Sequence, residues 1–390
     1  MTRVEFLKLS SLFGLSLPFQ GTLSACNTTQ QSDFKGKVLI IGAGVAGMSA
    51  AYLLQQQNIE FEILEAHTTY GGRVKRTTDF ANFPIPLGAE WLHVKPSQLN
   101  DIVNDEAIEI GIDFAKYKRS DSYATWENNK LEVGRMGTEK DLKFINSTWF
   151  DFYNEYIYPY ISSKIRYEVH IETINYTSDQ IELIDKNGSN YNCNKVIVTV
   201  PLKMLQLGEI SFIPKLPLAK STAIDKAKVW GGIKVFLEFS ESFYPTYISV
   251  PSRNNNESQF LYYDASYGQN TNQHILGVFA VGTAADNLTS LTNEEIKNQI
   301  LNELDQIFYG KATEVFVKYL VQNWSMEPLF KGAYISDNSD SSLLYDLGQS
   351  VDNKVFFAGE AYTNGNDWGG AHAAAEAAKK TVEEILEIKL

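Results

Sequence analysis

Three glycines and one acid have the types and spacing needed to bind a dinucleotide. Gly42, Gly44 and Gly47 form the pattern G-x-G-x-x-G, and Glu65 follows the first glycine by 23 positions. In such a pattern the first glycine permits a tight turn, the second lets a pyrophosphate approach the backbone, and the third lets a helix pack closely on a strand. The acid can accept hydrogen bonds from ribose hydroxyls. We therefore predict a bound dinucleotide, and the pattern alone fits NAD and FAD equally.

The elements around these residues must form a strand, a turn, a helix and a second strand. Residues 37–41 are a continuous apolar run, as expected of a buried parallel strand. Residues 48–57 predict a helix, whose N-terminus offers free N–H groups to phosphates, and residues 61–64 predict a strand that ends at Glu65. A lone glycine pattern could be no more than a tight turn, but here all the elements agree with a nucleotide site.

Distant parts of the chain carry related features. Tyr70-Gly71-Gly72-Arg73 follows soon after Glu65, and residues 196–200 form another apolar run that Pro201 ends. Near the C-terminus, residues 355–360 form a short apolar strand that ends in Gly359-Glu360, before an alanine-rich helix. We therefore expect both ends of the chain and a middle segment to meet in one nucleotide-binding domain.

These motifs, in this order, resemble those of the flavin-containing amine oxidase family, which includes monoamine, polyamine and L-amino-acid oxidases. The resemblance covers most of residues 36–390. It implies an α/β fold, in which an FAD-binding Rossmann-like domain is interleaved with an α+β substrate domain. The residues that it places against FAD are Gly42, Gly44, Gly47, Glu65, Gly72, Arg73, Gly88, Ala89, Trp91, Val169, Trp324, Gly359, Glu360, Gly370 and Ala371.

Lys234 is the candidate catalytic residue. It lies in the alternating segment 230–239, and the alternation alone predicts a solvated lysine on a half-exposed sheet. The resemblance instead implies that Lys234 holds a water molecule against flavin N5. A cation at that place would stabilise negative charge on the reduced flavin.

The resemblance also implies a substrate cage. Tyr334 matches an aromatic residue that forms one wall, and the opposite wall falls on Asp367 or on its neighbour Trp368. Asp367 could pair with a cationic amine or could simply cap its loop. Some members of the family carry a cysteine that bonds to the flavin just before the aromatic wall. Ala333 stands there in this chain, so we expect non-covalent FAD.

His93 and His372 are expected to be a loop histidine and a helix-start histidine rather than bases. No spacing typical of metal ligands is present, so no metal is expected. The chain of 390 residues has a net charge of -13, which argues against a nucleic-acid partner. Its 44% hydrophobic content argues against a disordered chain.

The first residues resemble an export signal. Arg3 and Lys8 precede the apolar stretch 9–19, which is too short to span a bilayer. Leu23-Ser24-Ala25-Cys26 resembles a bacterial lipobox, in which the cysteine is acylated. We therefore expect a signal peptide at residues 1–25, a lipid anchor at Cys26, and an exported protein held at the cell envelope, periplasmic or outer surface, through this anchor alone. An ordinary cleavable signal is the alternative, and the secretory and twin-arginine export routes both stay open.

The motifs also predict the domain boundaries. A flexible tether is expected at residues 26–35. The FAD-binding domain takes residues 36–90, 164–230 and 345–390, and the substrate domain takes residues 91–163 and 231–344.

Three functions fit this sequence. The leading one is an FAD-dependent amine oxidase, in which the α-carbon of a small-molecule amine gives hydride to flavin N5 and O2 reoxidises the flavin to give hydrogen peroxide. The second is an FAD-dependent desaturase or protoporphyrinogen-type oxidase. The third is a surface lipoprotein that binds FAD without catalysis. The pairing of Lys234 with Tyr334 favours the amine oxidase.

Overall fold

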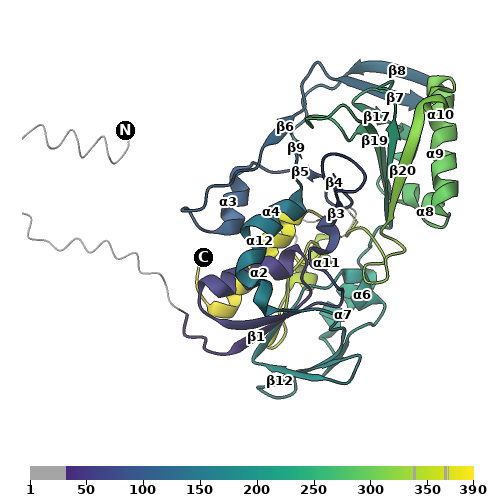
Figure 1. Cartoon of the computed structure of the whole chain (residues 1–390). Coiled ribbons are helices and arrows are strands. Elements are labelled where there is room, and N and C mark those ends of the chain that lie inside the picture. Colours follow the sequence, from purple (N-terminus) through teal and green to yellow (C-terminus); the bar gives the residue numbers. More distant parts are fainter. Residues whose placement is uncertain (1–31, 337–339, 364–366, 368) are drawn as a thin grey trace, which may run out of the picture. The chain divides into compact units, whose positions relative to one another are not determined.

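A computed structural model describes residues 32–336, 340–363, 367 and 369–390. The expected signal peptide, Cys26, the first part of the tether and Trp368 lie outside these residues. Figure 1 shows the order of the elements along the chain. Within the described residues, no helix combines the length and the apolar character needed to cross a membrane.

The nucleotide-binding region is built on a parallel sheet of five strands in the order β10-β2-β1-β14-β21. The first and second strands, β1 (Lys37–Ile41) and β2 (Glu60–Leu64), come from the N-terminal part of the chain. The others are β10 (Ile165–Arg166), β14 (Lys195–Val198) and β21 (Val355–Phe357). Strands from all three expected pieces of the FAD-binding domain therefore meet in one sheet.

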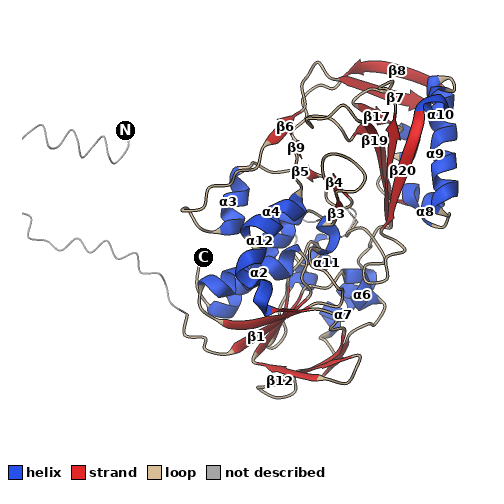
Figure 2. Ribbon diagram, viewed as in Figure 1, coloured by secondary structure: helices blue, strands red, loops and turns tan. Residues whose placement is uncertain are grey.

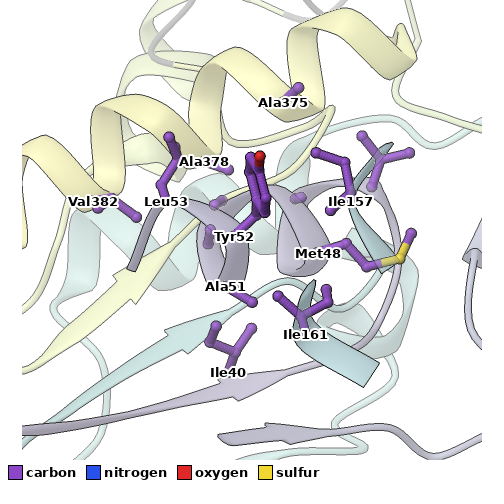
Figure 3. Packing of buried hydrophobic residues seen from close by; sticks show 14 of the residues in the cluster. Ile40, Met48, Ala51, Tyr52, Leu53, Ile157, Ile161, Ala375, Ala378 and Val382 are labelled. Atoms are coloured by element: carbon purple, nitrogen blue, oxygen red, sulfur yellow. The ribbon is translucent and has the colours of Figure 1, made fainter. Parts of the chain in front are cut away.

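Helices cover one face of this sheet. The helix α2 (Val45–Gln56) follows β1 directly, and α12 (Ala371–Leu386) packs beside it. Figure 3 shows Leu53 of α2 next to Ala378 and Val382 of α12. Small alanine side chains on α12 let the two helix backbones approach closely. The shorter helices α3 (Ser97–Val103), α4 (Trp149–Tyr156) and α5 (Tyr158–Ile161) complete this layer.

Two cores form because side chains alternate along the central strand. Val38 and Ile40 of β1 join the core under α2 and α12, whereas Leu39 and Ile41 join a second core on the opposite face. A four-stranded sheet of order β13-β12-β11-β15 covers this opposite face with α6, α7 and α11. The bounds of these elements are β11 Ile171–Asn175, β12 Ile181–Asp185, β13 Asn190–Cys193, β15 Ser211–Ile213, α6 Leu202–Gln206, α7 Leu218–Lys226 and α11 Ser341–Gly348.

A seven-stranded sheet forms the second large layer, in the order β20-β16-β19-β18-β17-β7-β8. Helices α8, α9 and α10 cover one of its faces (Figure 2). The hairpin of β7 and β8 comes from the expected piece 91–163 and pairs with β17 from the piece 231–344. The bounds are β7 Ser122–Glu127, β8 Lys130–Arg135, β16 Gly232–Phe239, β17 Tyr247–Ser249, β18 Ser258–Asp264, β19 His274–Gly282, β20 Phe316–Asn323, α8 Thr283–Thr289, α9 Asn293–Phe308 and α10 Lys311–Val315.

Short strands connect the two large sheets. The pair β3 (Arg76–Thr77) and β4 (Ile85–Pro86) lies near the nucleotide end. The strands β5 (Trp91–Leu92), β6 (Phe114–Lys116) and β9 (Leu142–Phe144) form a sheet of order β5-β9-β6.

Two expectations from the sequence are wrong. The strand β16 is not half exposed, because helices cover one face and Phe236 packs into another apolar cluster on the other face. Residues 32–35 are not part of a flexible tether. Ser32 is buried and its hydroxyl donates to the carbonyl of Leu386 at 2.7 Å, while Phe34 packs against the core.

Candidate functional site

One cavity of about 780 Å³ connects the nucleotide region with the seven-stranded sheet. Its lining includes the carboxyl ends of β1 and β2, the N-termini of α2 and α12, and residues of β16, β18 and β19. Ligands of open α/β sheets bind at such carboxyl ends. The expected site residues that line the cavity are Gly42, Gly44, Glu65, Gly72, Arg73, Gly88, Ala89, Trp91, Val169, Lys234, Trp324, Tyr334, Gly359, Glu360, Asp367, Gly370 and Ala371.

The three glycines of the first turn have different structural roles. Gly42 has a φ of +105°, which favours glycine. A Cβ on Gly47 would lie 1.9 Å from the carbonyl oxygen of Gly42, so this glycine lets α2 pack against the turn and does not line the cavity. A Cβ on Gly44 would meet nothing within 4 Å. Gly44 therefore presents open backbone to the cavity at the first turn of α2.

Glu65 lies where an adenosine ribose is expected. Its carboxylate accepts hydrogen bonds from the backbone N–H groups of Ala43 at 2.5 Å and His67 at 2.8 Å. Burial raises the pKa of Glu65, and these two N–H groups oppose that effect. Two backbone bonds fix the carboxylate and leave acceptor capacity for ribose hydroxyls. Val169 lies beside it, because the Val169 N–H donates to the Glu65 carbonyl at 2.9 Å.

Arg73 and Glu360 join the two ends of the chain at the cavity wall. Arg73 Nη1 donates to Glu360 Oε1 at 3.0 Å and to the carbonyl of Ala333 at 2.5 Å. The other oxygen of Glu360 accepts the backbone N–H of Ile335 at 3.2 Å. The arginine turn and the C-terminal turn are therefore held at one place, beside the residue that precedes Tyr334.

These residues fit FAD. Open backbone at Gly44 and the α2 N-terminus suit a pyrophosphate, and a fixed carboxylate at Glu65 suits a ribose. The N-terminus of α12, which begins after Gly370, lines the cavity as a second positive helix end. Between the two helix ends the lining is apolar and aromatic, with Trp91, Trp324 and Tyr334, as a flat tricyclic ring requires.

Lys234 lies at the cavity wall, buried on β16. Its ammonium group donates to Glu90 Oε2 at 2.5 Å, to the Pro86 carbonyl at 2.7 Å and to the Gly88 carbonyl at 3.2 Å. Pro86 is the last residue of β4, and Gly88 belongs to the loop between β4 and β5, which lines the cavity. The lysine therefore ties the seven-stranded sheet to the loop that faces the expected flavin.

Tyr334 faces the same cavity, where its ring makes an edge contact with Trp230 at a centroid distance of 5.8 Å. Ala333 also lines the cavity, so the position before the aromatic wall carries no thiol. Cys193 is the free cysteine of the described part of the chain, and it is buried in the core under the four-stranded sheet. No described residue therefore offers a thiol at the cavity for a covalent flavin bond.

Two histidine–aspartate pairs line the cavity. Asp367 bonds His372 Nε2 at 2.7 Å, and Asp141 bonds His93 Nδ1 at 2.9 Å. The two imidazole rings are 6.4 Å apart. Asp367 therefore bonds a histidine of α12 and does more than cap its own loop. His93 is a loop residue and His372 lies in the first turn of α12, as expected, but both reach the cavity.

The sequence did not assign a role to Glu90 or to Lys143. Glu90 lies inside the motif Gly88-Ala89-Glu90-Trp91. An acidic residue within an expected cofactor loop was the feature of the sequence that could have indicated its role. Lys143 lies on β9 and reaches Glu90 only because β9 pairs with β5. No spacing in the sequence could reveal that contact. Among the described residues, no group of three or more His, Cys, Asp or Glu side chains could hold a metal ion.

Comparison with protein families gives two matches. The model described as flavin containing amine oxidoreductase matches residues 155–386, which is more than half of the chain. The model described as NAD(P)-binding Rossmann-like domain matches residues 40–105.

Curated relatives include two kinds of protein. Lysine-specific histone demethylase 1B of Mus musculus is 24% identical over 83% of this chain and 50% of its own length. Probable polyamine oxidase 4 of Arabidopsis thaliana is 24% identical over 94% of this chain and 90% of its own length. The chain thus spans about half the length of the histone demethylases.

Solved structures show the same fold. A putrescine oxidase bound to putrescine has a TM-score of 0.73 and 16% identity, over 91% of this chain and 99% of that chain. A cyclohexylamine oxidase from Brevibacterium oxydans has a TM-score of 0.75 and 14% identity, over the same shares of the two chains. At these identities the likeness concerns the fold, and it covers both large sheets.

Proposed function

Because the chain belongs to the family of flavin-containing amine oxidoreductases, we propose that it is an FAD-dependent amine oxidase. The observation that carries the proposal is one continuous cavity, which runs from the glycine turn at Gly44 to Lys234 and Tyr334. Bound there, the flavin would accept a hydride from the carbon next to the amine nitrogen and pass the electrons to O2, which gives hydrogen peroxide. The substrate is a small-molecule amine.

The chain's own residues support this chemistry in separate ways. Tyr334 gives an apolar, electron-rich wall that can hold an amine. Carboxylates of Glu139, Asp141 and Asp367 also line the cavity, and their negative charge attracts cationic amines. Lys234 supplies a fixed cation where negative charge develops.

Two histidine side chains can hold protons near the substrate. His372 Nε2 is bonded to Asp367, and His372 Nδ1 is buried without a hydrogen-bond partner among the described residues. His93 is bonded through Nδ1 to Asp141. These pairs are placed to exchange a proton with an amine in the cavity.

Purified protein tests the proposal directly. We expect a yellow protein that releases peroxide when one of a panel of monoamines, diamines, polyamines or amino acids is added. Protein prepared without FAD serves as the control, and peroxide should then appear only after FAD is restored. A yellow protein that releases no peroxide and whose flavin no amine bleaches without O2 would contradict the amine oxidase. A colourless protein that takes up no added FAD would contradict the whole assignment.

We also propose that the protein is exported and anchored to the cell envelope by a lipid on Cys26. The support is the order of basic region, apolar region and Leu-Ser-Ala-Cys in the sequence. Cys26→Ala is expected to move the protein from the membrane fraction to the soluble fraction. Cys193→Ala is the matched control, because that cysteine is buried in the core and should not affect the location. Membrane association that survives Cys26→Ala would contradict the anchor.

A further inference from the structure

A buried cluster of charges lies behind the cavity wall at Lys234. Glu90 Oε2 accepts hydrogen bonds from Lys234 Nζ at 2.5 Å and from the Tyr263 hydroxyl at 2.7 Å. Lys143 Nζ lies 3.2 Å from the other oxygen, Glu90 Oε1. The side chains of the three charged residues are only 1–4% exposed. Two cations therefore share one carboxylate away from water.

Only one of the two cations faces the cavity. Lys234 and Glu90 belong to the cavity lining, whereas Lys143 lies behind them and donates to the carbonyls of Asp264 at 3.2 Å and Ala265 at 2.7 Å. With all three groups ionised, the cluster carries one net positive charge. If Lys234 loses its proton, Lys143 and Glu90 balance each other and the cluster carries no net charge, so the ionisation of Lys234 decides whether the cavity wall is positive.

The surroundings of Lys234 fit its charged form. A lysine ammonium has three N–H donors and no acceptor, and three oxygens surround this one, from Pro86, Gly88 and Glu90. A neutral amine has two donors and a lone pair, which would have to face one of these oxygens. Two carbonyls and one carboxylate thus compensate for the burial of the charge.

The pKa directions agree with this geometry. Burial lowers the pKa of Lys234 below its usual value, Glu90 opposes this by raising it, and Lys143 lowers it further. Burial would raise the pKa of Glu90, but the two lysines outweigh burial and lower it. Removing the carboxylate would leave only burial and Lys143, which both oppose a charge on Lys234.

Other titratable groups near the cluster stay neutral or face away. Tyr117, Tyr247 and Tyr263 are buried, and burial together with Glu90 raises the pKa of Tyr247 and Tyr263. Burial also raises the pKa of Tyr117. Burial raises the pKa of Asp264, and Lys143 and His274 oppose that effect. Glu90 is therefore the carboxylate that acts directly on Lys234.

We propose that Glu90 is a positioning residue that keeps Lys234 charged at the cavity wall, while Lys143 stabilises the Glu90 carboxylate from behind. This rests on the proposed function, because the bound flavin is the group that feels the charge. A fixed cation beside the flavin stabilises the negative charge that reduction adds. The cluster therefore raises the reduction potential of bound FAD.

Glu90→Gln tests the proposal by the direction in which it shifts the reduction potential of bound FAD. The variant keeps the size and one acceptor oxygen of the side chain but removes its charge. If Lys234 loses its proton in the variant, a cation disappears from the cavity wall and the reduction potential of bound FAD falls. If Lys234 stays charged without Glu90, a neutralising anion is lost and the potential rises. A fall supports the proposal, and a rise or an unchanged potential overturns it.

Matched variants separate this effect from general damage. Lys234→Met should lower the potential as Glu90→Gln does, and the double variant should have the potential of Glu90→Gln alone, because Lys143 is then the remaining charge of the cluster in both proteins. Lys220→Met removes another buried lysine, which contacts carbonyls at the end of α11 and does not line the cavity. It should leave the potential unchanged. If the effects of the two changes simply added in the double variant, the charge of Lys234 would not depend on Glu90, and the proposal would be overturned.

Wild-type protein provides a test that does not depend on the folding of the glutamine variant. The potential of the wild type should exceed that of Lys234→Met at neutral pH, and the difference should vanish at alkaline pH as Lys234 loses its proton. No difference at any pH would mean that Lys234 is neutral, which overturns the proposal. Failure of the proposed function looks different, because the wild type then binds no FAD or binds FAD and oxidises no amine.

Discussion

Gly44→Ala should weaken FAD binding without changing the stability of the folded protein. A Cβ at this position meets no protein atom within 4 Å, and the backbone of Gly44 has φ -79° and ψ -173°, which alanine adopts without strain. The stability of the protein without FAD should therefore change by no more than about 0.5 kcal/mol. The added methyl group points into the open space that a pyrophosphate would occupy, so it should weaken FAD binding.

The size of the effect follows from the contact that the methyl group blocks. A hydrogen bond to a charged group contributes about 1.5–3 kcal/mol. Losing one such bond between the backbone and a phosphate should raise the Kd for FAD by about ten- to a hundredfold. The assay is a fluorescence titration of FAD-free protein with FAD, together with chemical unfolding of the same FAD-free protein.

Two other glycines give matched controls. A Cβ on Gly47 would lie 1.9 Å from the Gly42 carbonyl oxygen, so Gly47→Ala should destabilise the protein even without FAD, by about 1–3 kcal/mol. Gly134 lies on the hairpin strand β8, and a Cβ there would touch only a backbone oxygen at 3.9 Å. Gly134→Ala should change neither FAD affinity nor stability. An unchanged FAD affinity in Gly44→Ala, or a stability loss as large as that of Gly47→Ala, would refute the reasoning.

Three further predictions concern flavin attachment, catalysis and pH. Acid precipitation should release the flavin, because Ala333 offers no thiol, and colour that stays in the pellet would contradict this. Lys234→Met should keep FAD bound but slow flavin reduction or reoxidation by about tenfold or more, because the variant loses one electrostatic contact to the developing charge. Stopped-flow absorbance measures both steps. Unchanged rates would remove Lys234 from the mechanism. Burial lowers the pKa of Lys220 to about 7, whereas the unfolded chain keeps a lysine pKa near 10.4. Between these values the unfolded state binds more protons, so the free energy of unfolding should rise with pH from about 7 to 10. This rise should be smaller in Lys220→Met, measured by urea unfolding across that range, and an equal rise in both proteins would contradict the prediction.

Local patterns in the sequence predicted the nucleotide half of the fold well. The apolar run at residues 37–41 is a strand with those bounds, and the predicted helix at residues 48–57 is the helix Val45–Gln56. These elements were predictable because the spacing of apolar residues and the residue types of a turn are properties of a short stretch of chain.

The surroundings of Lys234 could not be predicted in this way. The alternating pattern around it indicates a sheet with one face exposed to water, and β16 is instead an interior strand between β19 and β20, with both faces covered. The covering elements come from residues far away in the chain, namely the loop at 86–90 and the cluster that contains Phe80 and Phe83. Burial depends on these long-range neighbours, which a period-two pattern does not encode.

The sequence by itself determined that this protein has a dinucleotide fold with glycines at the phosphate turn, because steric limits on a tight turn act between residues close in the chain. It also determined, by the order of its motifs, which family the chain resembles. Only the tertiary structure decided which charges face one another. Glu90, Lys143 and Lys234 are separated by 53 and 91 positions along the chain, yet they share one dry site. Electrostatic energies depend on distance and burial in space, and both are set when the sheets pack together.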